Sequence, residues 1–517
     1  MRHHPPNGQH QEPEKGNGKK GRRIAVLLHD LGGKGYTTPL AYGSLPEMLG
    51  FSKLRTMALH VDLTSLFGSG SDARLTRTAF ADALPRAVAV REAHLNQRPE
   101  WRGLGAREEF LAECRKRAGE VMADGTVEAF VILGIGGSAL GNAALLAALA
   151  PIYQEWSPAS GRPKIFIPDS VDPDWIAALL ENLPLDRTHF NVISKSGGTI
   201  ETASEFLVFF DAVKKAVGSE EEAKKRFTIT TDPAQGHFRK LCNEQGFASL
   251  TVPPGVGGRF SILTSVGLFT SEIAGLDTQS MLEGASRVDR NLAECLPEDD
   301  PALAWSLAHV LYLEQGKNVH VHFPYSHRMR LLADWYKQLW AESLGKKHAV
   351  DGSVVHRGPT PVKAVGPTDQ HSQVQLYAEG PDDKVYTFLK LRDFAQQVEV
   401  PAPFVPSPAF DHLHGQTLND LVEAERLGTE VALCDAGRPV SILELCKLDA
   451  FHVGQYFMFM EIATAYAGGL MDIDPFDQPG VEAGKVVALA LMGAGYEDQA
   501  KEIRQALAER DLFRLSC

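Results

Sequence analysis

The sequence predicts an α/β protein built from two doubly wound parallel-sheet sandwich domains, with helical appendages at the N- and C-terminal ends. The chain has 517 residues, which is more than one hydrophobic core of ordinary size accommodates. Short apolar runs, each followed by a polar turn and a helix-like stretch, occur in two separate series. This alternation is typical of parallel sheets covered by helices on both faces.

The composition is that of a soluble globular protein and argues against several classes of partner. Apolar residues make up 44% and charged residues 23% of the chain. The net charge of −13 disfavours binding to nucleic acid or to an anionic membrane surface. The six cysteines are scattered and form no C-x-x-C pair. Neither a disulfide framework nor a zinc motif is therefore indicated, and a cytoplasmic location is expected.

The N-terminal part carries no clear motif. Residues 1–23 are polar and basic without an apolar stretch, so we expect a disordered tail rather than a signal peptide. Residues 24–110 mix helix-like and loop-like stretches and are interpreted as an N-terminal extension.

The first predicted sandwich domain spans residues 111–295. Its expected strands are four short apolar or β-branched runs, namely Phe130–Leu133, Lys164–Pro168, Phe190–Ile193 and Phe227–Thr230. Residues 129–154 contain no charged residue and are long enough to cross a bilayer. Glycines interrupt this stretch and Pro151 ends it, which favours a strand, a turn and a helix over a membrane span.

The second predicted domain spans residues 300–460. Its expected strands are Asn318–Phe323, Val374–Tyr377, Val385–Leu389 and Val431–Leu433. Leu331–Leu344 and His452–Tyr466 are expected to be helices between or after these strands. Residues 461–517 are interpreted as a helical C-terminal segment.

A stretch rich in hydroxyl groups and glycine, residues 194–202, follows the third strand of the first series. Five of its nine residues carry a hydroxyl or an ammonium group: Ser194, Lys195, Ser196, Thr199 and Thr202. Gly197 and Gly198 allow a tight turn, and free amides at a helix N-terminus attract an anion such as phosphate. A turn with a helix-capping box has the same composition, so both interpretations stay open at this point.

A second glycine-rich turn, Gly134–Ala139, follows the first strand. It fits the dinucleotide fingerprint G-x-G-x-x-A, which is weak evidence by itself. The acidic residue that should follow about 20 positions later is absent, because the candidate Asp169 lies 33 positions after Gly136. An NAD-dependent dehydrogenase therefore remains only an alternative.

Further blocks of sequence resemble the glucose-6-phosphate isomerase (phosphoglucose isomerase) family, in which both glycine-rich turns also occur. In chain order these blocks are Gly257–Ser261, Gln338–Glu342, Gly366–His371 and Phe476–Lys485. The resemblance covers roughly residues 100–490 and implies two sugar-isomerase (SIS) domains. Pro254 departs from the pattern, because the family usually has an acidic or small polar residue there. This leaves the conformation of the loop before Gly257 in question.

The resemblance implies reversible isomerisation of glucose 6-phosphate to fructose 6-phosphate, in glycolysis and gluconeogenesis, without a metal or organic cofactor. The reaction passes through a cis-enediolate, and a single carboxylate can take the proton from C2 and return it to C1. Glu342 matches the family's catalytic glutamate, and Gln338 shares its helix face and can orient base or sugar. Arg259 is always protonated and suits the negative charge of the intermediate.

The resemblance assigns ring opening to His371 and Lys485, since a near-neutral histidine is a suitable proton carrier. In the family this histidine reaches the site from the neighbouring subunit, which implies a homodimer. Gly137 and Ser138 are expected to contact sugar or phosphate, and Gly258 is expected to allow close approach.

Two histidine pairs, His320 with His322 and His412 with His414, suggest a metal site. No carboxylate or cysteine pattern completes either set, so core or loop histidines are favoured and no metal is predicted. A non-catalytic sugar-phosphate-binding regulator is a further alternative, but it would lack Glu342, Arg259 or Lys485. Activity on mannose 6-phosphate is left open.

Overall fold

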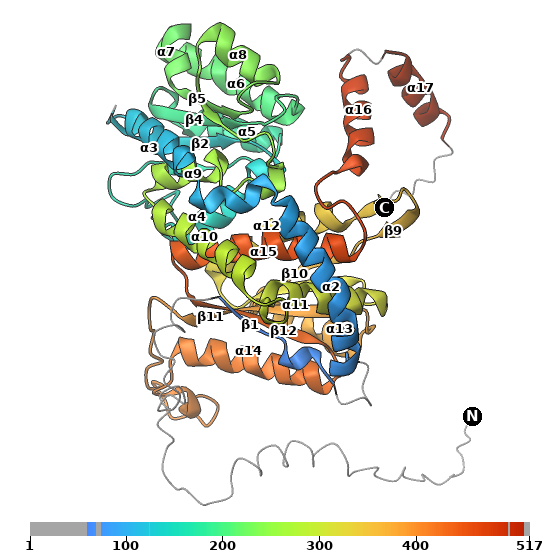
Figure 1. The fold of residues 1–517 in the computed structure, drawn as a ribbon. Coiled ribbons are helices and arrows are strands. Elements are labelled where there is room, and N and C mark those ends of the chain that lie inside the picture. Colours follow the sequence, from blue (N-terminus) through green and yellow to red (C-terminus); the bar gives the residue numbers. More distant parts are fainter. Residues whose placement is uncertain (1–58, 69–73, 124, 495–496, 511–517) are drawn as a thin grey trace, which may run out of the picture. The chain divides into compact units, whose positions relative to one another are not determined.

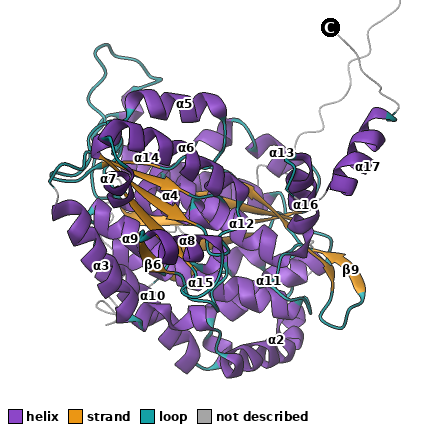
Figure 2. Ribbon diagram, turned by 90° about the horizontal axis from the view of Figure 1, so that it is seen from above, coloured by secondary structure: helices purple, strands orange, loops and turns teal. Residues whose placement is uncertain are grey.

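The computed structural model (Figure 1) describes residues 59–68, 74–123, 125–494 and 497–510. The tail predicted at residues 1–23 and the extension up to residue 58 lie outside the described residues. The described part holds two five-stranded sheets and a two-stranded sheet of β8 (Lys346–His348) and β9 (Val354–Arg357). The fold is α/β, as the sequence predicts, and helices surround the strands (Figure 2).

The first sheet consists of five parallel strands in the order β3-β2-β4-β5-β6. Their bounds are β2 (Ala129–Leu133), β3 (Lys164–Phe166), β4 (Thr188–Ile193), β5 (Phe227–Thr231) and β6 (Ala248–Thr251). The first four confirm the predicted strands, and β6 is an edge strand that was not predicted. Phe130 and Ile132 of β2 belong to one buried cluster, whereas Val131 and Leu133 belong to another. Both faces are therefore covered, which explains the continuous apolar runs.

Helices and short turns alternate with the strands of this sheet. The helices are α3 (Glu108–Ala123), α4 (Leu140–Leu149), α5 (Pro173–Asn182), α6 (Ile200–Val217), α7 (Glu220–Lys225), α8 (His237–Gln245), α9 (Ser265–Ala274) and α10 (Thr278–Glu294). The 3₁₀ turn η5 (Gly136–Ser138) follows β2, and η7 (Gly258–Phe260) follows β6. Because the strands are parallel, both turns leave the same edge of the sheet.

The second sheet has the order β1-β12-β11-β7-β10. Its strands are β1 (His60–Asp62), β7 (Val319–Pro324), β10 (Thr360–Lys363), β11 (Lys384–Asp393) and β12 (Val440–Lys447). β1 is antiparallel to β12, and the other pairs are parallel. The associated helices are α2 (Arg77–Gln97), α11 (Pro301–Glu314), α12 (Arg330–Leu344), α13 (Val374–Glu379), α14 (Leu418–Asp435) and α15 (Ala450–Leu470).

Two predicted strands of the second series are wrong. Val374–Tyr377 forms most of α13, and Val431–Leu433 lies in α14. Arg426, Thr429 and Leu433 are buried on α14 at helical spacing, and a capping box of Thr417 and Asp420 starts this helix. Short apolar runs do not distinguish a strand from a buried helix segment, which explains both errors.

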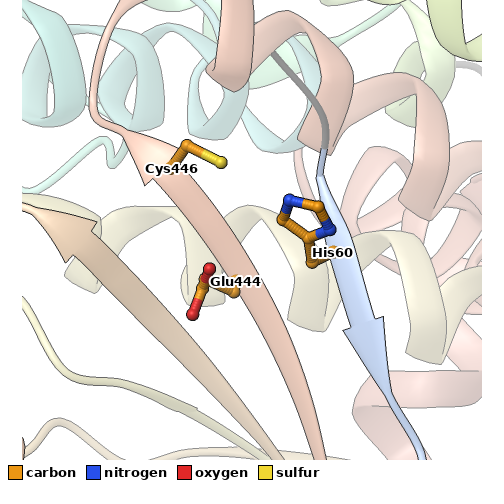
Figure 3. A group of neighbouring side chains, drawn as sticks. All are labelled: His60, Glu444 and Cys446. Atoms are coloured by element: carbon orange, nitrogen blue, oxygen red, sulfur yellow. The ribbon is translucent and has the colours of Figure 1, made fainter. Parts of the chain in front are cut away.

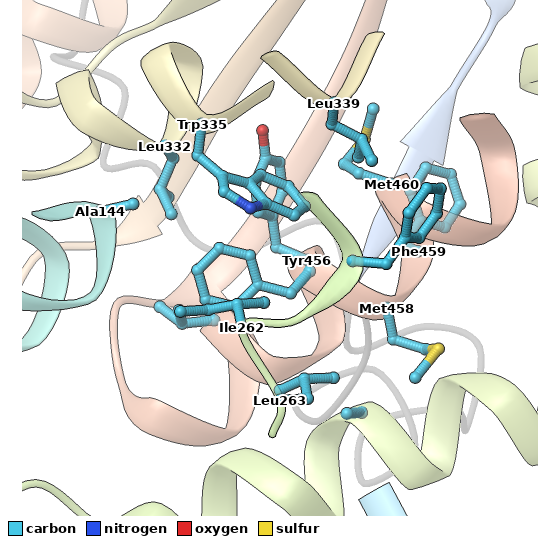
Figure 4. Packing of buried hydrophobic residues seen from close by; sticks show 14 of the residues in the cluster. Ala144, Ile262, Leu263, Leu332, Trp335, Leu339, Tyr456, Met458, Phe459 and Met460 are labelled. Atoms are coloured by element: carbon cyan, nitrogen blue, oxygen red, sulfur yellow. The ribbon is translucent and has the colours of Figure 1, made fainter. Parts of the chain in front are cut away.

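The two sheets share one hydrophobic cluster, which includes Phe130 of β2 and Leu443 of β12. α15 is buried along almost its whole length and packs with α12 in this cluster, as Trp335, Tyr456 and Met460 show (Figure 4). The domain boundary expected at residue 460 falls inside α15.

α15 also contacts α10 backbone to backbone. A Cβ atom on Gly284 of α10 would overlap the carbonyl of Phe451, and one on Gly454 of α15 would overlap the carbonyl of Met281. Two glycines thus allow these helices to approach closely.

The C-terminal part of the described chain is helical, as predicted, in α16 (Glu482–Leu491) and α17 (Glu497–Ala508). None of the helices in the described ranges has both the length and the apolar character that a bilayer crossing requires.

Candidate active site

Three elements meet around Glu342: η5, η7 and α12. A Cβ atom on Gly137 of η5 would lie 2.8 Å from the amide nitrogen of Arg259 and closer still to the carbonyl of Gly258. A Cβ atom on Gly136 would lie 3.0 Å from Nε2 of Gln338, and Gly136 has a positive φ of 58°. Glycine is required at both positions, because only its bare backbone fits between η7 and α12.

Glu342 lies in the last turn of α12, and its side chain is 25% exposed. Nε2 of Gln338 donates a hydrogen bond of 3.0 Å to its Oε2. Nη1 of Arg259 lies 3.4 Å from its Oε1. The structure therefore brings together Glu342, Gln338 and Arg259, and leaves the carboxylate accessible to a ligand.

Arg259 is held by acceptors on all three of its nitrogens, and its side chain is only 2% exposed. Nε donates to Oγ of Ser343 at 2.7 Å. Nη2 donates to the carbonyls of Pro475 and Asp477 at 2.6 and 3.1 Å. Nη1 faces Oε1 of Gln478 at 2.9 Å and the carboxylate of Glu342. With five acceptors for five N–H groups, Arg259 binds a ligand oxygen directly only if Nη1 exchanges a partner.

Burial lowers the pKa of Arg259, and the negative charges of Glu342, Asp477 and Asp474 oppose that effect. The guanidinium remains charged, because arginine does not lose its proton in proteins. A fixed cation thus lies beside the Glu342 carboxylate.

Lys346 is a member of this site that the sequence analysis missed. It begins β8, just after α12 ends, and its side chain is 4% exposed. Its Nζ donates to the carbonyls of Glu342 at 2.8 Å and Asp477 at 2.9 Å, and lies 3.4 Å from Oδ1 of Asp477. Its position four residues after Glu342 was a usable signal, because lysines often bind the last carbonyls of a helix.

The loop of residues 194–199 connects β4 to α6 and is held by hydrogen bonds of its own hydroxyl groups. Oγ of Ser194 donates to Oγ1 of Thr199 at 3.2 Å and accepts from the amide of Gly197 at 3.2 Å. Oγ of Ser196 accepts from the amide of Gly198 at 3.3 Å. Thr199 is the N-cap of α6 but makes no side-chain capping bond, so the capping box that the sequence left open as an alternative does not form.

Thr202, in the first turn of α6, has a buried hydroxyl that forms no hydrogen bond with any of the residues that the structure describes. Lys195 points in another direction: its Nζ donates to the carbonyl of Val256 at 2.8 Å and to that of Pro254. Burial lowers the pKa of Lys195, against the attraction of Asp232 and Glu100. Lys195 therefore ties the loop to the segment before η7, where Pro254 departs from the family pattern.

His371 and Lys485 are not brought to Glu342 within the described chain. His371 ends η10 (Thr368–His371) and is exposed. Lys485 lies on α16, is 59% exposed and pairs with Glu482 at 2.8 Å. In the described ranges neither residue forms a hydrogen bond or an ion pair with Glu342 or Arg259.

The histidines that suggested a metal site are part of the core or of an exposed loop. Nε2 of His320 bonds to Oγ1 of Thr387 at 2.8 Å, and Nε2 of His322 bonds to the hydroxyl of Tyr456 at 2.9 Å. Burial lowers the pKa of both histidines. His412 and His414 are exposed.

A different group offers donor atoms that lie within 4.8 Å of one another: His60 on β1 with Glu444 and Cys446 on β12 (Figure 3). His60 is directly opposite Glu444, and Cys446 is two residues further on the same face. Glu444 already pairs with Lys390 at 3.1 Å and with Arg392 at 3.8 Å. These two cations compete with a metal ion for the carboxylate.

The comparison with known proteins decides the family. The family described as Phosphoglucose isomerase matches residues 105–397. A glucose-6-phosphate isomerase of Carboxydothermus hydrogenoformans is 40% identical over 467 residues, which are 88% of this chain and 99% of the relative. The chain belongs to the phosphoglucose isomerase family. A second relative, the glucose-6-phosphate isomerase of Rubrobacter xylanophilus, is 38% identical over 81% of this chain and 95% of its own.

Solved structures share the fold of this chain. A hypothetical protein from Thermus thermophilus has a TM-score of 0.74 and 35% identity, over 84% of this chain and 100% of its own. A glucose-6-phosphate isomerase from Chlamydia trachomatis, at 23% identity and a TM-score of 0.66, shares the fold over 78% of this chain and 76% of its own.

Proposed function

We propose that this protein interconverts glucose 6-phosphate and fructose 6-phosphate by moving a proton between C2 and C1 of a cis-enediolate. The observation that carries the proposal is the meeting of η5, η7 and α12 around Glu342. There one accessible carboxylate lies between a fixed guanidinium and an amide donor. Membership of the phosphoglucose isomerase family supports the same reaction.

Glu342 is the base that removes the proton from one carbon and returns it to the other. Gln338 holds Oε2, which leaves Oε1 on the side of Arg259. Arg259 stabilises the oxyanion of the intermediate through Nη1, where an enediolate oxygen takes the place of Gln478 or of the carboxylate. No charge has to be created for this step, since the cation is already buried beside the base.

The phosphate group is bound by the loop of residues 194–202, at the N-terminus of α6. Ser194, Ser196, Thr199 and Thr202 supply hydroxyl donors, and the orphan hydroxyl of Thr202 favours a ligand there. Lys195 supports this loop through the carbonyl of Val256. The backbone of Gly137, Ser138 and Gly258 contacts the sugar.

Ring opening uses His371 and Lys485, and the active unit is a homodimer in which His371 completes the neighbouring site. In the described chain His371 forms no hydrogen bond or ion pair with Glu342, which is compatible with a role of His371 in the neighbouring site. The enzyme acts in the cytoplasm, in glycolysis and gluconeogenesis, and requires neither cofactor nor metal.

The test is turnover of fructose 6-phosphate by the parent and by Glu342→Gln in buffer with chelator. We expect the variant to lose at least about 10³-fold in kcat while it still binds sugar phosphate, because the isosteric amide cannot take the proton. Glu314→Gln is the control and should keep the parent's activity. Glu314 lies at the end of α11, is exposed and pairs with Arg86 of α2. Retained activity in Glu342→Gln would exclude this glutamate as the base, and a parent that binds without turnover would indicate a regulator.

A further inference from the structure

Lys346 and Arg259 are two buried cations that hold the same piece of chain. Arg259 donates to the carbonyls of Pro475 and Asp477, and Lys346 donates to the same carbonyl of Asp477. Residues 475–478 are thus attached from two sides. The last of these residues is Gln478. Its Oε1 accepts a hydrogen bond from Nη1 of Arg259, the same nitrogen that faces the carboxylate of Glu342.

Lys346 also holds the end of α12. The carbonyls in the last turn of a helix have no partner within the helix. Nζ of Lys346 donates a hydrogen bond to the carbonyl of Glu342. The amide of Gly345 donates one to the carbonyl of Ala341. The ammonium has three protons and three acceptors, namely two carbonyls and the carboxylate of Asp477.

A buried ammonium in this place is costly, because the carboxylate with which it pairs, that of Asp477, belongs to a side chain that is 53% exposed. Burial and the charge of Arg259 lower the pKa of Lys346, and Asp477 opposes them. A helix end and a loop could be solvated by water at lower cost. The lysine therefore serves to fix geometry rather than to gain stability.

We propose that Lys346 is a positioning residue of the isomerisation site. It ties the turn of α12 that carries Glu342 to residues 475–478, and so fixes the distance between the base and the Arg259–Gln478 pair. The proposal rests on the proposed function for its effect on turnover. The attachment of residues 475–478 to α12 is the structural part of the proposal, and it does not depend on that function.

The test compares Lys346→Met and Lys346→Arg with Lys317→Met. Lys317 is a matched control, because its side chain is also 4% exposed and its Nζ also contacts an aspartate carboxylate and carbonyl, those of Asp382. We expect Lys346→Met to lower kcat about 10- to 100-fold through misplacement of the base. KM for fructose 6-phosphate should stay within about threefold, since the phosphate loop is untouched. Lys346→Arg should recover part of the loss, and Lys317→Met should keep the parent's kcat.

Hydrogen exchange supplies a readout without turnover. Amides of residues 475–485 should exchange at least about tenfold faster in Lys346→Met than in the parent, and at the parent's rate in Lys317→Met. If Lys346→Met does not fold, Lys346→Gln takes its place. Unchanged exchange in the Lys346 variant overturns the proposal, and so does an equal loss of kcat in Lys317→Met. A parent without isomerase activity but with the expected exchange pattern would refute the proposed function and leave the attachment standing.

Discussion

At the scale of single residues, the contact between Gly137 and Gly258 shows that the η5 and η7 turns leave no room for a side chain at Gly137. The η5 and η7 turns meet through backbone atoms, and no side chain lies between them at this point. A displaced side chain can rotate away, but a displaced carbonyl moves the whole turn. The spacing between the glycine-rich turn and Arg259 is therefore fixed by glycine itself.

We expect Gly137→Ala to lower kcat/KM about 100-fold, because the new methyl group pushes η7 and Arg259 away from Glu342. Overpacking should also lower the free energy of unfolding by about 1–3 kcal/mol. Gly258→Ala is the matched comparison, since a Cβ atom there meets no atom within 4 Å. Its stability should equal the parent's, and a rise in KM would locate the sugar next to Gly258. Steady-state kinetics and urea unfolding measure both effects, and full activity of Gly137→Ala would contradict the close contact.

Some residues of the site follow from the sequence and others do not. Glu342 and Gln338 are four residues apart on a predicted helix, so their contact follows from helix geometry. The partners of Arg259 and Lys346 at residues 475–478 are more than 100 positions away in sequence. No local pattern encodes such a contact, and a lysine is usually a solvated surface charge.

At the scale of elements, α6 follows the proposed phosphate loop and also carries a buried acid. Glu205 is buried on this helix, one turn after Thr202. Burial raises its pKa to about 8, and the charges of Glu201 and Asp169 add to the effect. The folded protein therefore keeps Glu205 protonated at pH values at which the unfolded chain ionises it.

This difference predicts how stability depends on pH. Because the pKa of Glu205 is raised in the folded state, its protonation stabilises the folded protein fully below about pH 4.5. This stabilisation is lost progressively as the pH rises to about 8. Between pH 5 and 8 the free energy of unfolding of the parent should fall, relative to Glu205→Gln, by up to about 1.4 kcal/mol per pH unit. Urea unfolding at three pH values measures this. Glu181→Gln, at an exposed position on α5, is the control. Parallel curves for the parent and Glu205→Gln would contradict the prediction.

The errors in the predicted elements have a common cause. Val374–Tyr377 and Val431–Leu433 contain β-branched or aromatic residues typical of strands, but they are parts of α13 and α14 in which only Tyr377 and Leu433 are buried. The strand that closes the parallel set, β12, begins at Val440. Tertiary packing decides the state of such short runs, whereas the four strands of the first series were predictable because a polar turn follows each one.

At the scale of the whole molecule, His371 gives the proposed dimer a direct test, because it forms no bond with Glu342 in the described chain. If His371 completes the neighbouring site, Glu342→Gln and His371→Ala are each inactive as pure proteins. A heterodimer of the two has one site with both native residues. Random exchange of subunits should then restore about a quarter of the parent's activity, because half of the dimers are mixed and half of their sites are intact. Refolding the two variants together and measuring turnover checks this. No recovery despite mixed dimers would place His371 in its own subunit's site, and full activity of His371→Ala by itself would place it outside the site.

The contact of α10 with α15 has a consequence for the way this protein can be divided. Gly284 and Gly454 place the two helices so close that each lies against the other's backbone. α10 precedes the strands β7, β10, β11 and β12 of the second sheet in the chain, whereas α15 follows them. A gene cut between α10 and α15 would leave each product with an apolar surface that the missing helix normally covers. The two products would have to fold around each other. We therefore expect that one part can be replaced by that of another protein only if α10 and α15 are replaced together.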